Sequence, residues 1–372
     1  MHLDTSTLVF LSLAKAGLWE EKVMLAPYGE INWQTVYRLA EEQSLVGLVA
    51  AGIEQAKDIV VPPAIALKFA SSALRLEQRN TAMNEFVAKL VGKLRSEGIY
   101  ALLVKGQGIA QCYNRPLWRA CGDIDLFLDE PDYQKAKKFL TPLATSVEEE
   151  QVDKLHFSMY IDGWQVELHG TLHSNLGKKL DSILDAMQDA AFSDRKVRQW
   201  MDGETPVFLP AADEDAVFVF SHILQHFFRG GIGLRQICDW CRLLWTYRAD
   251  IDQELLDMRL KEMDTMAEWK AFAALAVNTL GMPADAMPFY SQDRRWTRKA
   301  DKILAFVLET GNFGHNRDNS YYKTSPYLVR KAISLWRHTK DGLRQFTIFP
   351  KHSLIAWGQM IKEGVKAVGK GK

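Results

Sequence analysis

Residues 102–128 read LLVKGQGIAQCYNRPLWRACGDIDLFL, and this stretch decides the fold. Two short apolar runs, 100–104 and 123–128, mark its ends, and short apolar runs bounded by turn residues indicate buried strands. The first run stops at Lys105-Gly-Gln-Gly, after which helical spacing resumes through Tyr113. The stretch therefore predicts a strand, a glycine-rich junction, a helix and a second strand.

A β-hairpin is the clearest local signal further along the chain. In residues 155–169, LHFSMYIDGWQVELH, two alternating runs flank Asp162-Gly163, the preferred two-residue hairpin turn. Counting outward from the turn gives one apolar and one polar face. The apolar face pairs Ile161 with Trp164, Met159 with Val166 and Phe157 with Leu168. The polar face pairs Tyr160 with Gln165, Ser158 with Glu167 and His156 with His169.

Helical periodicity dominates both flanks of this strand-rich centre. Upstream, Pro62-Pro63 separates shorter helices from one long helix expected over 64–97. Downstream, the expected helices are 214–228, 234–247, 252–264, 266–280, 295–310, 326–346 and 352–368. The predicted fold class is α+β. We expect a small mixed-sheet core at 99–212, an N-terminal helical region at 1–98 and a C-terminal helical region at 213–372.

The balance of charge argues against bulk binding of nucleic acid. The 372 residues include 46 Lys or Arg and 46 Asp or Glu, whereas coating a polyanion needs a strong positive field. Residues 325–372 are the exception, with ten basic and two acidic residues, a net charge of +8. A solvated helix face explains this tail, and a patch for an anionic partner is the alternative.

The remaining bulk features indicate a cytoplasmic protein. The four cysteines are too few for a disulfide scaffold in a chain of this length. No apolar run approaches the roughly eighteen residues of a transmembrane segment. The N-terminal stretch lacks the cationic start of a signal peptide and carries Asp4 and Lys15, which favours a capped amphipathic helix.

Two carboxylates in the decisive stretch indicate a metal site. Asp123 and Asp125 lie two residues apart on an expected strand, so their side chains point to the same face. Carboxylates this close repel each other unless a cation lies between them, and Mg²⁺ prefers such oxygen ligands. Glu167, on the polar face of the hairpin, is the expected third carboxylate.

The junction between the first strand and the following helix is the candidate phosphate site. Free backbone N–H groups at such a junction favour phosphate, and glycine permits close approach. The candidates are Lys105, Gly106, Gln107 and Gly108. Arg119 is a further candidate to neutralise a phosphate. The structural alternatives are a surface lysine, ordinary turn glycines and an ion pair between Arg119 and Asp129.

Taken together, these motifs resemble the polymerase-beta-like nucleotidyltransferase superfamily, and in particular an uncharacterised bacterial nucleotidyltransferase family. The similarity covers roughly residues 30–280, with a looser match at 346–350. The family pattern has a Lys-Gly pair, a Tyr and a Pro, an Arg, and an Asp-x-Asp; here these are Lys105 with Gly106, Tyr113, Pro116, Arg119, and Asp123 with Asp125. An acidic-x-His strand follows at Glu167 and His169. The later helical signature matches His226, Gly233-Leu234-Arg235-Gln236 and Asp239.

The resemblance implies a metal-dependent transferase. Asp123, Asp125 and Glu167 would be catalytic and would hold two Mg²⁺ or Mn²⁺ ions. The substrate would be an NTP, whose NMP passes to an unidentified acceptor such as a small molecule, a sugar or a peptide product. The expected pocket residues are His169, His226, Arg235 and Asp239. For His226, Arg235 and Asp239, an interhelical hydrogen-bond network is the alternative.

One departure from the superfamily keeps two other functions open. Gln107 stands where the superfamily usually has Ser or Gly, which weakens the expectation of efficient catalysis. A catalytically decayed nucleotide-binding scaffold is therefore one alternative. A toxin-type nucleotidyltransferase acting on protein or tRNA is the other, because of the basic tail. No motif indicates the base, the acceptor or the oligomeric state.

Three lesser patterns have simpler structural explanations. His222 and His226 share a helix face, but no third zinc ligand or HExxH signature accompanies them. Cys238 and Cys241 lie in an apolar helical pattern and are expected in the core. The last helix is amphipathic and basic, and packing on its own protein is favoured over binding to an anionic membrane.

Overall fold

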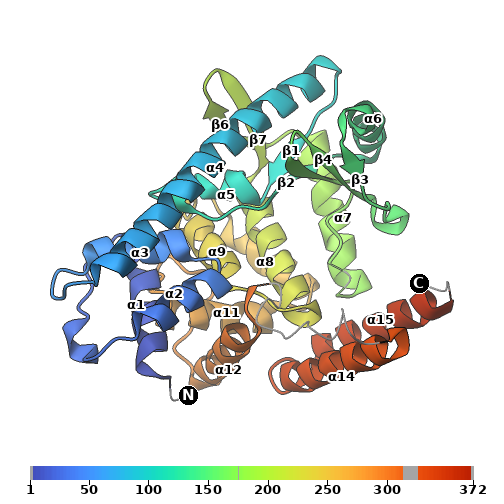
Figure 1. The fold of residues 1–372 in the computed structure, drawn as a ribbon. Coiled ribbons are helices and arrows are strands. Elements are labelled where there is room, and N and C mark those ends of the chain that lie inside the picture. The colour runs from blue at the N-terminus through green and yellow to red at the C-terminus, as the bar shows by residue number, and fades with distance from the viewer. Residues whose placement is uncertain (1–2, 175, 313–325, 370–372) are drawn as a thin grey trace.

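The computed structural model describes residues 3–174, 176–312 and 326–369. A five-stranded sheet with the order β1-β2-β5-β4-β3 lies in the upper half of the molecule, and most of the helices form a body below it (Figure 1). The strands are β1 Leu102–Val104, β2 Asp123–Phe127, β3 Ser146–Val147, β4 His156–Ile161 and β5 Trp164–His169. Strands β2 and β5 are parallel and the other neighbours antiparallel, so the predicted mixed sheet is confirmed.

The predicted hairpin is confirmed in every pair. Strands β4 and β5 pair from Ile161 with Trp164 at the turn to His156 with His169 at the open end. Asp162 and Gly163 both have positive φ, 51° and 82°, as the favoured two-residue turn requires. A shift by one residue would move the apolar side chains to the opposite face, so burial of that face maintains the register.

The apolar face of the sheet packs against two helices. These are α4, Pro63–Ser96, the long helix expected from the sequence, and α6, Glu130–Leu140. Ile124 of β2 and Val166 of β5 are buried in one cluster with Met83 of α4 and Tyr133 of α6. Pro63 occupies the first turn of α4, where its missing N–H costs no helical hydrogen bond.

A second hairpin and one helix lie in the part of the core where local pattern predicts no element. Strands β6, Val197–Asp202, and β7, Thr205–Pro210, form a separate two-stranded sheet, and α7 spans Lys178–Ser193. Pro206 and Pro210 remove ladder donors from β7 and hide its strand character in the sequence. A two-stranded sheet tolerates them because each strand has one unpaired edge.

The helical body contains both ends of the chain. Its N-terminal helices are α1 Thr5–Trp19, α2 Trp33–Glu42 and α3 Val46–Gln55. Its C-terminal helices are α8 Ala212–Arg229, α9 Leu234–Thr246, α10 Gln253–Glu262, α11 Met266–Asn278, α12 Arg294–Thr310, α14 Tyr327–Phe346 and α15 Pro350–Gly369. The seven expected C-terminal helices are confirmed, each within two residues at either end. Single 3-10 turns occur at Ala26–Tyr28, Pro116–Trp118, Thr141–Leu143 and Val152–Lys154, and α5, Gly106–Ala110, follows β1.

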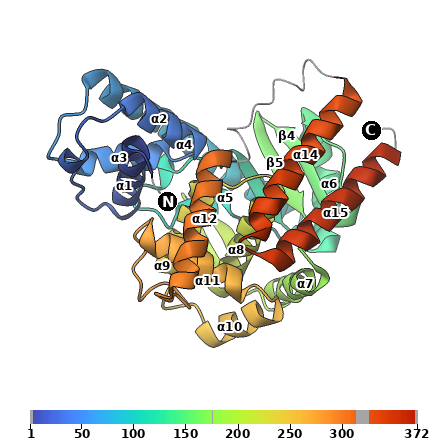
Figure 2. The ribbon, with the colours of Figure 1, turned by 90° about the horizontal axis from the view of Figure 1, so that it is seen from below.

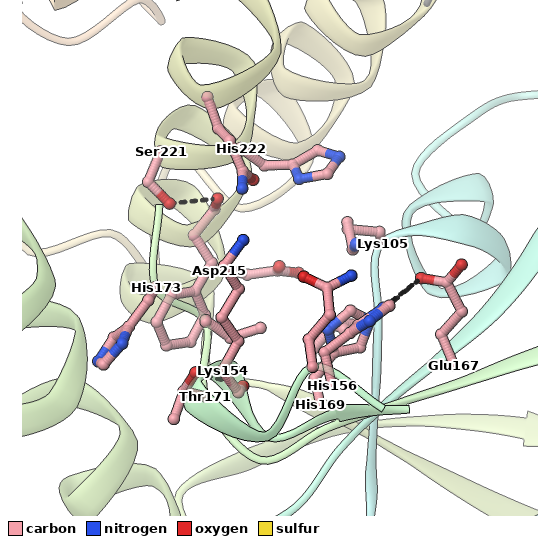
Figure 3. Close-up of a pocket in the computed structure, with 15 residues that line it drawn as sticks. Lys105, Lys154, His156, Glu167, His169, Thr171, His173, Asp215, Ser221 and His222 are labelled. Atoms are coloured by element: carbon pink, nitrogen blue, oxygen red, sulfur yellow. Dashed lines mark hydrogen bonds and ion pairs between the residues drawn. The ribbon is translucent and has the colours of Figure 1, made fainter. Parts of the chain in front are cut away.

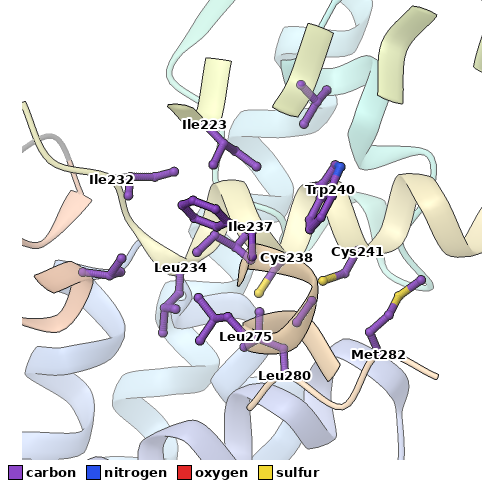
Figure 4. Close-up of a cluster of buried hydrophobic side chains, with 14 of the residues drawn as sticks. Ile223, Ile232, Leu234, Ile237, Cys238, Trp240, Cys241, Leu275, Leu280 and Met282 are labelled. Atoms are coloured by element: carbon purple, nitrogen blue, oxygen red, sulfur yellow. The ribbon is translucent and has the colours of Figure 1, made fainter. Parts of the chain in front are cut away.

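One hydrophobic core joins the N-terminal and the C-terminal helices. Gln43, fully buried after α2, donates to the carbonyl of Val307 and accepts from the backbone N–H of Leu234. Cys238 and Cys241 are free, fully buried thiols in this core, as expected (Figure 4). The three-part division at residues 98 and 212 stays a prediction.

The C-terminal helices pack on the protein itself. Helices α14 and α15 lie side by side (Figure 2), and both contact α8. His352 of α15 bonds Glu268 of α11 through Nδ1 at 2.8 Å, with both side chains buried. The last three residues of the basic tail lie outside the described residues. Among the helices that are described, none has both the length and the apolar character to cross a lipid bilayer.

Candidate active site

Three carboxylates meet on the polar face of the sheet. Asp123 and Asp125 share the face of β2, and the parallel register places Asp125 opposite Glu167 of β5. One oxygen of each carboxylate lies within 4.8 Å of the others. The sequence supplied the two strands and their faces, and the parallel pairing of β2 with β5 brings the third carboxylate to the first two.

Asp125 already has two partners in this cluster. Its Oδ1 lies 2.8 Å from Lys105 Nζ and 2.7 Å from His169 Nε2. Burial alone would raise the pKa of Asp125, but Lys105 and His169 outweigh it and hold that pKa well below its usual range. Burial alone would lower the pKa of Lys105, and the carboxylates of Asp125 and Asp123 raise it instead.

The pKa of Asp123 is shifted by the charges around it. Repulsion from Asp125 and then burial raise the pKa of Asp123 to about 6, although Lys105 opposes the change. His169 is affected in the other direction, because burial outweighs its bond to Asp125 and lowers its pKa. The cluster therefore places the Lys105 ammonium group beside the carboxylates of Asp125 and Asp123, and beside an imidazole whose pKa burial lowers.

The backbone between β1 and α5 is held in an unusual conformation. Lys105 has φ of 57°, a region that costs a residue with a Cβ, and such strain gathers at functional sites. Gly106 follows with φ of 37°, and a Cβ there would lie 3.3 Å from Cys121 Sγ. This turn directs the Lys105 ammonium group toward Asp125.

The other two junction residues face away from the carboxylates. The Gln107 side chain is buried and donates to Asn80 Oδ1 on α4 at 2.8 Å. A Cβ on Gly108 would lie 2.7 Å from Leu209 Cδ2 on β7. Of the four candidate phosphate contacts at this junction, the structure therefore brings Lys105 and Gly106 to the carboxylates, whereas Gln107 and Gly108 serve the packing of α5.

Arg119 lies at the wall of the site and is held by α9. Its Nε and Nη2 donate to the two oxygens of Asp239 at 2.8 and 2.7 Å, and both side chains are buried. Tyr113 Oη also donates to Asp239, at 2.7 Å. Asp129, the alternative partner of Arg119, accepts instead from the backbone N–H of Asp132 at the start of α6.

Arg235 is less completely bonded. Its Nη1 donates to the carbonyl of Ala120 at 2.7 Å, whereas its buried Nε has no hydrogen-bond partner within the described part of the chain. The positive charge of Arg235 also opposes the rise in the pKa of Asp123. The Arg235 guanidinium therefore lies near the carboxylates. It is therefore the arginine best able to accept a new anionic partner.

Helix α8 contributes two uncharged histidines. The rings of His222 and His226 lie 4.3 Å apart. Burial and then the positive charge of Lys105 lower the pKa of both, that of His226 to about 4. Within the described residues, neither belongs to a group of three potential metal ligands, so the zinc pair gains no support.

Two cavities meet at the carboxylates. One, of about 210 Å³, is lined by Gly106, Asp123, Asp125, His226, Arg235 and Asp239, among others. The other, of about 220 Å³, is lined by Lys154, His156, His169, Thr171 and His173, among others (Figure 3). Lys105, Glu167 and His222 line both. No sequence pattern indicates Lys154, Thr171 or His173, because they lie outside the strands of the hairpin.

A mixed sheet with an Asp-x-Asp strand, a third carboxylate on its parallel neighbour and a Lys-Gly turn beside them defines a nucleotidyltransferase core. The comparison with protein families agrees, since residues 29–281 match the family described as "Uncharacterised nucleotidyltransferase". This match covers more than half of the chain, and the protein belongs to that family. Searches of curated proteins and of solved structures each returned no match.

Proposed function

We propose that this protein is a Mg²⁺-dependent nucleotidyltransferase that moves an NMP from an NTP to an acceptor hydroxyl or similar group. The acceptor is a small molecule, a sugar or a peptide product, because the overall charge offers no field for a long polyanion. The observation that carries the proposal is the convergence of Asp123, Asp125 and Glu167 beside a cavity that Lys105 and Arg235 also line.

The donor set fits Mg²⁺ or Mn²⁺. All three ligands are carboxylates, and hard divalent cations prefer oxygen and retain positions for water and phosphate. Lys105 neutralises only one of the three charges, and the raised pKa of Asp123 reflects the excess that remains. When bound, two such ions would neutralise the triphosphate and favour the ionised form of the attacking hydroxyl.

Side chains around the first cavity suit a triphosphate. Lys105 and Arg235 are cations at its wall, and Gly106 has no side chain to obstruct a phosphate oxygen. Their role is to bind the phosphates and align the α-phosphorus for attack. As the acceptor oxygen bonds to phosphorus, the bond to pyrophosphate breaks.

The second cavity suits the acceptor. It shares Glu167 and His222 with the first cavity, so a molecule bound there adjoins the carboxylates. His222 is partly buried and burial lowers its pKa, so an uncharged imidazole stands at this boundary and limits access of water to the reacting atoms. Polar groups such as Thr171 and Lys154 then supply hydrogen bonds that orient the acceptor.

The decayed-scaffold alternative rests on Gln107, whose side chain bonds α4, does not line the first cavity and so does not take the place of a phosphate-holding serine. The convergence of three carboxylates is the observation that opposes this alternative. The basic tail remains the argument for an enzyme acting on protein or tRNA. A salt-dependent tRNA affinity of the purified protein would favour that alternative over a small acceptor.

A labelling experiment tests the proposal. The purified chain is incubated with Mg²⁺ and each labelled NTP, with a cell extract as the source of acceptors, and released pyrophosphate is measured. The Asp123→Ala, Asp125→Ala double variant is the inactive control. Asp189→Ala is the matched control, because it removes an exposed carboxylate that lines neither cavity. Equal release by the wild type and the double variant would refute the proposal.

A further inference from the structure

The polar face of the hairpin carries a second group of potential metal ligands. His156 of β4 pairs directly with His169 of β5, and Glu167 precedes His169 by two residues on the same face. Alternation and cross-strand pairing thus place two imidazoles and a carboxylate on one patch of the sheet. Regular strands hold all three, so little ordering is needed to bring them together.

The three ligand atoms are close enough to share one ion. His156 Nε2 lies 3.2 Å and His169 Nε2 lies 3.6 Å from Glu167 Oε2, and one ligand atom of each residue falls within 4.8 Å of the other two. Bonds of about 2.0–2.2 Å to a tetrahedral ion would separate neighbouring ligand atoms by roughly 3.3–3.6 Å. Binding therefore requires small side-chain adjustments, in which His169 Nε2 exchanges its hydrogen bond to Asp125 Oδ1 for the ion.

The donor types separate this group from the carboxylate cluster. Two imidazole nitrogens and one carboxylate oxygen are typical of sites for Zn²⁺ and related first-row transition metals, whereas Mg²⁺ prefers oxygen alone. The groups also face different spaces. His156 and His169 line the 220 Å³ cavity, as does Glu167 (Figure 3). Asp123 and Asp125 line the 210 Å³ cavity, which Glu167 also lines.

We propose that His156, His169 and Glu167 bind a first-row transition-metal cation of the Zn²⁺ type, at a site that adjoins the pair Asp123 and Asp125 but does not include it, since His169 Nε2 lies 2.7 Å from Asp125 Oδ1. Three protein ligands leave at least one coordination position, which a group bound in the 220 Å³ cavity can occupy. Glu167 joins the two sites, as a bridging carboxylate does in two-metal centres. The proposal rests on these ligands alone and does not require nucleotidyl transfer.

Metal titration of the full chain tests the site. After treatment with a chelator, the protein is titrated with Zn²⁺ by calorimetry and with Co²⁺ by visible absorption. We expect one ion per chain, and His156→Ala and His169→Ala should each weaken binding by more than about a hundredfold, because even outer-shell changes at metal sites cost about 10–100-fold.

Two controls locate the ion. His173→Ala removes a histidine that lines the same cavity and pairs with Asp185, and it should leave Zn²⁺ affinity within about threefold of wild type. Asp123→Asn should also retain Zn²⁺ and Co²⁺. If Asp123→Asn removes Co²⁺ as strongly as His156→Ala does, the ion sits on the carboxylates and the proposal is overturned. Failure of Mg²⁺-dependent transfer with retained Co²⁺ binding would contradict the proposed function only.

A measurement on the wild-type chain avoids dependence on the folding of variants. The chain loaded with one equivalent of Cu²⁺ is examined by pulsed electron paramagnetic resonance, which detects nitrogen nuclei of coordinated imidazole. Coupling to two imidazoles is the expected result. The absence of imidazole coupling, or failure of the metal-free chain to take up one equivalent of any of these ions, overturns the proposal.

Discussion

Two buried carboxylates line the same cavity, and the structure holds them in different ways. Asp239 receives three donors, two from Arg119 and one from Tyr113, and its ion pair is electrically balanced. Asp125 receives Lys105 and His169, but two further carboxylates stand beside it. The first arrangement is saturated, whereas the second has an excess of negative charge.

This difference distinguishes a structural ion pair, or support, from a candidate reactive site. A buried carboxylate with a bidentate arginine has little capacity for another ligand, and its loss leaves a buried charge unpaired. A cluster of three carboxylates with one ammonium group gains from any added cation. We infer that Arg119 and Asp239 anchor α9 against the segment after α5, while Asp123, Asp125 and Glu167 form the reactive centre.

The largest effect is expected for Asp123→Asn. The change removes a ligand of the proposed metal site, so transfer measured by pyrophosphate release should fall by at least about a thousandfold, since a metal supplies several kcal/mol of transition-state stabilisation. The free energy of unfolding in urea should not fall, because repulsion from Asp125 disappears. A marked loss of stability would break the distinction between site and support.

The second-largest effect, a loss of stability, is expected for Asp239→Asn. Arg119 would keep its buried charge without an anionic partner, and the free energy of unfolding should fall by about 3–5 kcal/mol. The double variant Arg119→Met, Asp239→Leu should regain most of this loss, because it leaves no charge to pair. If the single variant unfolds at the same urea concentration as wild type, the pair is not a support.

Lys105→Met should have a smaller effect on catalysis. We expect kcat/KM for the NTP to fall by about a hundredfold, because one charged contact to the phosphates is lost. The variant should also bind Mg²⁺ more tightly by calorimetry, since a competing cation has left Asp125. Weaker Mg²⁺ binding would show that Lys105 organises the carboxylates and does not compete with the ion.

Glu214 offers a third kind of buried carboxylate and the smallest effect. It is 6% exposed, one of its oxygens has no partner among the described residues, and burial raises its pKa to about 7. The folded state therefore holds this proton more tightly than the unfolded state, in which the pKa is near its ordinary value of 4.5. Its contribution to stability is complete below pH 4.5 and is lost as pH rises to 7.

Glu214→Gln tests that sign. The variant should gain about 1–3 kcal/mol over wild type in urea unfolding at pH 8, and the gain should shrink toward zero near pH 4.5. A gain that does not depend on pH would mean that the carboxyl group of Glu214 does not titrate in this range.

Much of the fold follows from local pattern. The Asp162-Gly163 turn sets the register of β4 and β5 by counting alone, and the apolar stripes of the C-terminal helices locate them within two residues. Local pattern does not predict the hairpin of β6 and β7. Its prolines contradict strand propensity, and only its place beside α4 and β1 makes the pairing favourable.

Local sequence identifies the candidate site residues and the strand face that each one occupies, because alternation along a strand is a local property. Their partners depend on how the elements pack in three dimensions. The parallel pairing of β2 with β5 brings Glu167 to Asp125, α9 engages Arg119, and α4 engages Gln107. Residues far apart in the chain make these contacts, and packing of whole elements, not local spacing, determines which ones form.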